Sequence, residues 1–200
     1  MTATSSSKTA APRGGLMATP AADLPTLGSQ TRAEVGDELQ AMLVELVDLS
    51  LLGKQLHWSV VGPGFRPLHE QLDEFVDVWR ELADTVAERA VAVGAWPDGQ
   101  RGALVAGSPV VMVECGALVD QGVVHALTHC LQDISERARG RMDRLGYVDT
   151  ASQDVITDVV RELEKQLWML CAQVSAPHEH ASETDPSMGE LAPEMTGRDR

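Results

Sequence analysis

Four long stretches of apolar residues at helical spacing constrain the fold of this 200-residue chain more than any other feature. Within each stretch the apolar side chains recur three or four positions apart, which is the period of one helix face. Each stretch begins and ends at residues typical of helix ends, such as Thr, Gly and Pro. The stretches cover residues 31–61, 67–94, 113–145 and 150–176.

Local signals at the ends of these stretches predict where the helices begin and end. Thr31 and Glu34 have the spacing of a capping box at the start of the first helix. Gly62–Gly64, with Pro63 between, ends that helix. Pro67 suits the first position of the second helix, because an N–H there would be unpaired anyway. Thr150 or a neighbour is expected to cap the fourth helix.

The lengths of the links predict the topology. The links between the first two helices and between the last two are short, so each pair should be antiparallel. The link from about 95 to 112 has 18 residues and can stretch to roughly 60 Å. The second helix, with 28 residues, is only about 42 Å long. The link can therefore cross back along the bundle, with room for a short helix, as in the ferritin-like arrangement.

The chain is therefore predicted to be all-α, with a ferritin-like four-helix bundle over residues 29–176. Residues 1–28, rich in Ser, Thr, Ala, Pro and Gly, and residues 177–200, with three prolines and six acids, are predicted to be disordered tails. Three scattered cysteines favour a reducing compartment. No apolar run is long enough for a signal peptide or a membrane span, so a cytoplasmic protein that does not bind membranes is expected.

Histidines and carboxylates form a stripe that predicts a metal site. On the second helix His69, Asp73, Asp84 and Glu88 fall within about 100° of one another at the usual helical twist. His57 lies near the end of the first helix. Imidazole with carboxylate is a ligand set for iron, manganese or zinc, and the surplus of oxygen favours iron or manganese. The net charge of −14 also suits a protein that gathers cations.

Distance along the helix determines how such a site is assembled. His69 and Glu88 are nineteen residues apart, or roughly 28 Å along one helix, so they cannot bind one ion within one chain. Two copies of the second helix, antiparallel about a two-fold axis, would bring the two ends together. The alternative is a solvated helix face with charge pairs such as Asp77 with Arg80. No histidine follows a glutamate by three positions, so a di-iron site inside the bundle is not expected.

Several segments together resemble the Dps family, the ferritin-like proteins of starved bacterial cells, over roughly residues 30–175. They are Lys54-Gln55-Leu56-His57-Trp58, Gly62-Pro63-x-Phe65, Leu68-His69-Glu70, Asp73, Asp84, Ala87-Glu88-Arg89-Ala90 and Leu163-Glu164-Lys165-x-Leu167-Trp168.

The resemblance implies a hollow dodecamer with ferroxidase sites at its two-fold interfaces. His57, His69 and Asp73 would come from one subunit and Asp84 and Glu88 from its partner, with up to two iron ions in each site. The implied reaction is oxidation of ferrous iron, preferably by hydrogen peroxide, and storage as a ferric mineral.

The resemblance also suggests a role for each residue. Asp73 and Glu88 would neutralise and hold the cation, and the two histidines would be neutral nitrogen ligands. Asp84 would bind a second iron or orient another ligand. Trp58 would accept stray oxidising equivalents, or simply pack.

DNA compaction by a nucleoid-associated protein is the alternative function. Many members of the family bind DNA through a basic tail, whereas residues 1–30 contain only Lys8 and Arg13 against Asp23. Because DNA affinity rises with the number of phosphates neutralised, strong binding is not expected here.

Three further groups have weaker signals. His125 and His129, four apart on the third helix, are interpreted as structural. Asp149, Asp154 and Asp158 either line a cation pore, by the same resemblance, or cap a helix. His178 and His180 in the C-terminal tail are attributed to chance.

Overall fold

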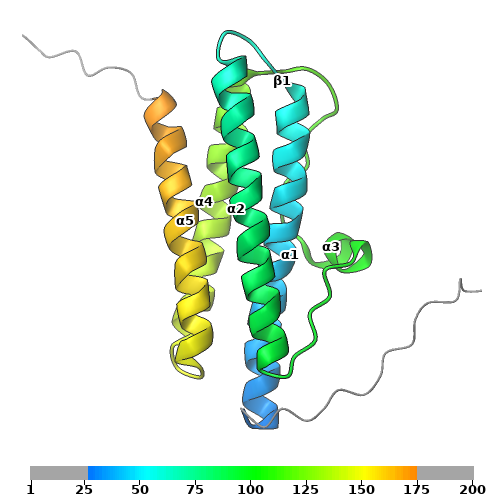
Figure 1. Ribbon diagram of the computed structural model, residues 1–200, viewed down its shortest axis with the longest axis vertical. Coiled ribbons are helices and arrows are strands. Elements are labelled where there is room, and N and C mark those ends of the chain that lie inside the picture. Colours follow the sequence, from blue (N-terminus) through cyan, green and yellow to red (C-terminus); the bar gives the residue numbers. More distant parts are fainter. Residues whose placement is uncertain (1–26, 175–200) are drawn as a thin grey trace, which may run out of the picture.

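The computed structural model describes residues 27–174, which form five helices and two short strands (Figure 1). Helices α1, α2, α4 and α5 form a four-helix bundle, and α3 lies in the long connection between α2 and α4. This confirms the predicted all-α bundle with one long crossover and a short helix in it. The elements are α1 (Ser29–Ser59), β1 (Val60–Val61), α2 (Phe65–Ala92), α3 (Arg101–Gly107), β2 (Leu118–Val119), α4 (Asp120–Leu145) and α5 (Thr150–Val174).

A two-stranded bridge sets the direction of the second hairpin. Val60 pairs with Leu118, and Val61 with Val119, in parallel register. Strand β1 leads into α2 and β2 leads into α4, so both helices start at the same end of the bundle (Figure 1). The predicted parallel arrangement of the second and third long helices is therefore confirmed.

The start of α4 differs from the prediction. The third helix was expected from about Val113, but α4 begins at Asp120, because Leu118 and Val119 form β2 instead. The Asp120 carboxylate accepts a hydrogen bond of 2.6 Å from the backbone N–H of Gly64. The first turn of α4 is thus tied to the loop before α2, a contact that no local pattern encodes.

In contrast to α4, the first and second helices begin earlier in the sequence than predicted. Helix α1 starts at Ser29 after Gly28, and no side chain caps it, so the capping box predicted at Thr31 is wrong. The Glu34 carboxylate instead accepts a hydrogen bond from the Gln30 amide. Pro67 is the third residue of α2 rather than its first, and it still lies in the first turn.

The turn between α4 and α5 is built around Asp149. Its carboxylate accepts hydrogen bonds from the backbone N–H and the hydroxyl of Ser152, so a neighbour of Thr150 caps α5 as expected. Arg89 of α2 donates to the same carboxylate at 2.7 Å and to the Ser152 hydroxyl at 2.9 Å. This network supports the helix-capping interpretation of Asp149.

Aliphatic side chains fill the centre of the bundle around one aromatic ring. Trp79 is fully buried, and its indole N–H donates a hydrogen bond of 2.6 Å to the buried side chain of Gln166. Gly53 of α1 lies directly against this ring: a Cβ there would be 2.5 Å from Trp79. The absence of a side chain at Gly53 therefore allows α1 and α2 to pack closely.

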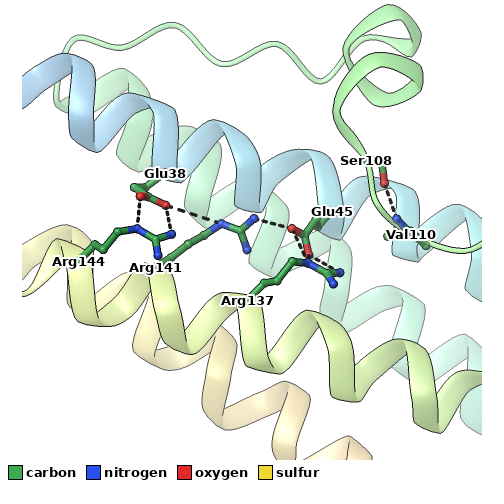
Figure 2. Close-up of polar contacts among 7 residues, drawn as sticks. All are labelled: Glu38, Glu45, Ser108, Val110, Arg137, Arg141 and Arg144. Atoms are coloured by element: carbon green, nitrogen blue, oxygen red, sulfur yellow. Dashed lines mark hydrogen bonds and ion pairs between the residues drawn. The ribbon is translucent and has the colours of Figure 1, made fainter.

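Ion pairs between α1 and α4 extend into the core, and no pattern in the sequence predicts them. Arg137 and Arg141 both donate to the carboxylate of Glu45, which is 1% exposed (Figure 2). Glu38, nearer the surface, accepts from Arg144. Pairing matters most at Glu45, because an unpaired charge in the interior is costly.

The predicted tails, residues 1–28 and 177–200, lie outside the described residues except for Leu27 and Gly28. Across residues 27–174, no helix combines the length and the apolar character needed to cross a membrane.

Candidate metal centre

Two histidines meet at the hairpin between α1 and α2. His57 lies in the last turn of α1 and His69 near the start of α2, and the short loop between the helices brings them together. Their rings stack with centroids 3.5 Å apart and planes inclined by 21°. His57 is 7% exposed, and His69 is partly exposed.

Reciprocal hydrogen bonds determine the tautomer of both rings. His57 Nδ1 lies 2.9 Å from the backbone carbonyl oxygen of His69, and His69 Nδ1 lies 2.9 Å from that of His57. A carbonyl oxygen can only accept, so each Nδ1 must carry a proton. In a neutral imidazole this leaves the lone pair on Nε2, which is the atom that can bind a metal.

Asp73 lies one helical turn after His69. Its Oδ1 is 3.2 Å from His57 Nδ1 and accepts a hydrogen bond from the ammonium group of Lys54. This hydrogen bond, with the charges of nearby His57 and Lys54, lowers the pKa of Asp73 below its ordinary value although partial burial raises it. The carboxylate is therefore ionised at neutral pH and half-exposed, ready to bind a cation.

Lys54 is a site residue to which sequence reasoning gave no role. It lies three positions before His57, so both side chains project from the same face of α1. That spacing is the signal that could have identified it. Its ammonium group is also 6.0 Å from the centre of the Trp58 ring, within reach of a cation–π contact.

Exposed aromatic side chains flank the two histidines. Trp58 is 71% exposed, and Phe65, 43% exposed, lies 5.0 Å from the His69 ring. Large apolar groups left in solvent beside polar ones are typical of surfaces that contact another protein.

Asp84 and Glu88 lie far from this group. Helix α2 is continuous from Phe65 to Ala92, so Glu88 is roughly 28 Å from His69 along it. Both acids are exposed. In the part of the chain that the structure describes, no three His, Cys, Asp or Glu side chains are grouped so that they could hold a metal ion. One chain therefore places His57, His69 and Asp73 near one another at one end of α2 without forming a complete metal site, and Asp84 and Glu88 lie far from them.

One charge pair of the solvated-face alternative is present. Arg80 lies 3.9 Å from Asp77, both of them well exposed. Such a pair contributes little to stability.

Comparisons with known proteins place this geometry in context. Residues 36–176 match the ferritin-like domain. The DNA protection during starvation protein of Mycolicibacterium smegmatis is 33% identical over 76% of this chain and 84% of its own length. The solved structure of Dps from Mycobacterium smegmatis in its tetragonal form has a TM-score of 0.74 at 32% identity, over 79% of this chain and 96% of that one. The structure of Dps from Microbacterium arborescens in the high iron form has a TM-score of 0.71 at 29% identity, over 74% and 97%.

Proposed function

The chain belongs to the ferritin-like family and, within it, to the DNA-protection-during-starvation (Dps) proteins, and from this premise we propose that it oxidises ferrous iron at a site shared by two copies of the chain. The preferred oxidant is hydrogen peroxide. The ferric product is stored as a mineral inside a hollow dodecamer. A solved relative described in a high iron form supports iron as the substrate.

The observation that carries this proposal is the reciprocal bonding of His57 and His69. Both Nδ1 atoms are held by backbone carbonyls, so both Nε2 atoms are left for metal binding without a change of tautomer. Asp73 supplies a carboxylate beside them whose pKa is already lowered. Two neutral nitrogens and one anionic oxygen suit a ferrous ion.

A second copy completes the ligand set. Asp84 and Glu88 are exposed and lie about four and five turns of α2, respectively, away from His69. When two α2 helices lie antiparallel, the acid end of one meets the histidine end of the other, and the site occurs twice in each pair. The exposed rings of Trp58 and Phe65 would then be covered by the second copy.

The redox step needs only the named substrates. Each ferrous ion gives up one electron, so a pair of ions reduces one hydrogen peroxide and its O–O bond breaks. The ferric ions then take up oxygen from water and release protons as the mineral forms. Glu88 and Asp73 balance the rising charge of the metal, and Asp84 binds the second ion or orients a ligand. Trp58 lies close enough to accept a stray oxidising equivalent, and ordinary interface packing is its other role.

Rapid-mixing absorbance of the full-length protein tests the proposal. Protein loaded anaerobically with ferrous iron receives one pulse of peroxide or of oxygen, and ferric absorbance is followed. The wild type should oxidise iron far faster than a protein-free control, with peroxide faster than oxygen. The double variant Asp73→Ala, Glu88→Ala should match the control. Glu74→Ala, an exposed acid next to Asp73, should behave as wild type.

Assembly is measured on the same samples by sedimentation. If the double variant assembles normally and still oxidises iron at the wild-type rate, the proposed ligands are wrong. A wild type no faster than the protein-free control would overturn the ferroxidase itself.

DNA binding is the second candidate, favoured by the name of the relatives, DNA protection during starvation protein. The charge of this chain argues against strong binding: the net charge is −14, and Arg89, Arg139 and Arg144 are already paired with carboxylates. A salt-sensitive gel shift that is lost when residues 1–28 are removed would establish it.

A further inference from the structure

A second pair of histidines lies on α4, away from the proposed iron ligands. His125 and His129 are one helical turn apart, and their ring centroids are 4.8 Å apart in an edge-on arrangement. Both residues are exposed. The pair therefore does not belong to the buried core, and the structural role interpreted from the sequence stays a prediction.

The surroundings of the pair leave its nitrogens available. Among residues 27–174, no hydrogen bond or ion pair joins either ring to another group, in contrast to His57 and His69, whose Nδ1 atoms are bonded to carbonyls. His125 lines an open cleft of about 480 Å³ between α4 and the end of α5, together with Gln121, Gln173 and Val174. A hydrated cation therefore has room to approach.

The ligand chemistry favours metals other than iron. Imidazole nitrogen suits zinc, copper and nickel, which stand above ferrous iron in the usual order of affinities. Neighbouring Cys130 does not contribute, because its side chain is buried in the core. Two histidines four positions apart on one helix face can bind one ion together.

We propose that His125 and His129 bind a late first-row divalent cation, of which zinc is the probe, at a surface site separate from the proposed iron centre. Water completes the coordination shell in the adjoining cleft. The proposal does not depend on the ferroxidase assignment, since no residue is shared.

Equilibrium dialysis of the iron-free, full-length protein against zinc tests this site. The variant His57→Ala, His69→Ala, His178→Ala, His180→Ala serves as the background, because it removes the other four histidines of the chain. In this background zinc should bind at about one equivalent per chain, as expected for one two-histidine site. Adding His125→Ala and His129→Ala should abolish that equivalent, and His129→Ala alone should weaken binding by about tenfold or more through loss of the chelate.

Copper(II) provides an independent readout. Its electron paramagnetic resonance spectrum in the background variant should show coupling to nitrogen nuclei of two imidazoles, and this coupling should be lost without His125 and His129. Because both side chains are exposed, alanine should leave the fold intact, which circular dichroism checks. An unchanged zinc isotherm in the variant that lacks all six histidines, or no nitrogen coupling in the background, would overturn the proposal.

Discussion

The ammonium group of Lys54 is paired with the carboxylate of Asp73, which lies beside the two stacked histidines. The pair joins α1 to α2 and keeps the carboxylate close to His57. In the proposed reaction a ferrous ion competes with this ammonium group for the same oxygen atoms. Lys54 thus holds the carboxylate in place and opposes the first metal ion at the same time.

Replacing Lys54 by Met should tighten metal binding. The apolar chain of Met keeps the packing while the competing charge is lost. An exposed ion pair contributes up to about 1 kcal/mol, so ferrous iron should bind up to about fivefold more tightly. Anaerobic titration calorimetry measures this, with Lys165→Met, which removes the exposed pair with Glu162, as the control. Weaker binding in Lys54→Met would show that positioning by Lys54 outweighs its competition.

Glu45→Gln should destabilise the bundle severely. It removes the closer anion of the buried guanidinium of Arg141, which keeps only Glu38 at 3.9 Å (Figure 2), and breaking a buried pair of this kind costs about 3–5 kcal/mol. Glu38→Gln removes a more exposed carboxylate from the same ion pairs and should cost about 1 kcal/mol or less. Urea unfolding followed by circular dichroism compares the two. An equal loss of unfolding free energy in the two variants would mean that Glu45 is not held in an apolar environment.

Gly53→Ala should loosen the packing of α1 against α2. The new methyl group would lie 2.5 Å from Trp79 and 2.6 Å from Val76, both fully buried, and overpacking of this kind costs about 1–3 kcal/mol. Gly102→Ala is the matched control, because nothing lies within 4 Å of a Cβ at that helical position. It should stabilise the protein by about 0.5–1 kcal/mol. A red shift of tryptophan fluorescence in Gly53→Ala would report the disturbed ring.

The turn at Asp149 should make stability depend on pH. Burial raises the pKa of this carboxyl, but hydrogen bonds from Ser152 and Arg89 outweigh it and hold the pKa below the ordinary 3.8. Its stabilisation is therefore complete above about pH 4 and is lost as pH falls through the lowered folded pKa. Asn at this position still caps a helix but cannot pair with Arg89 as an anion.

The measurement is Tm against pH for wild type and Asp149→Asn. The Tm difference should be constant between about pH 5 and 7 and should shrink on acidification below about pH 4. Asp154→Asn, an exposed carboxylate in the same helix, is the control and should change Tm little. A difference that grows toward acid pH would contradict the assignment.

Periodicity and link length were sufficient to predict the bundle. The spacing of leucines and valines predicted four long helices, and the long connection between α2 and α4 predicted their parallel direction. The predicted start of α4, at about Val113, was wrong because Leu118 pairs with Val60, a contact between distant parts of the chain. Local patterns carry no information about such pairs. The predicted capping box at Thr31 was wrong because α1 already begins at Ser29, two residues earlier.

Only part of the candidate site could be predicted from the sequence. A hairpin with a short loop necessarily brings His57 toward His69, so their proximity could be expected. The reciprocal bonds to backbone carbonyls could not, because they depend on the path of the chain at Val60–Gly64. Lys54 and the buried Glu45–Arg141 pair were missed since a charged residue on a helix is usually solvated.

The two kinds of contact at the α1–α2 loop differ in their separation along the chain. His57 and His69 are 12 positions apart, whereas Gly64 and Asp120, which join the loop to α4, are 56 apart. Closing a short loop loses less chain entropy and happens sooner. The histidine pair should therefore form early in folding, as soon as the first hairpin closes. During synthesis of the chain, the two histidines would then already lie side by side before α4 and α5 form the second hairpin.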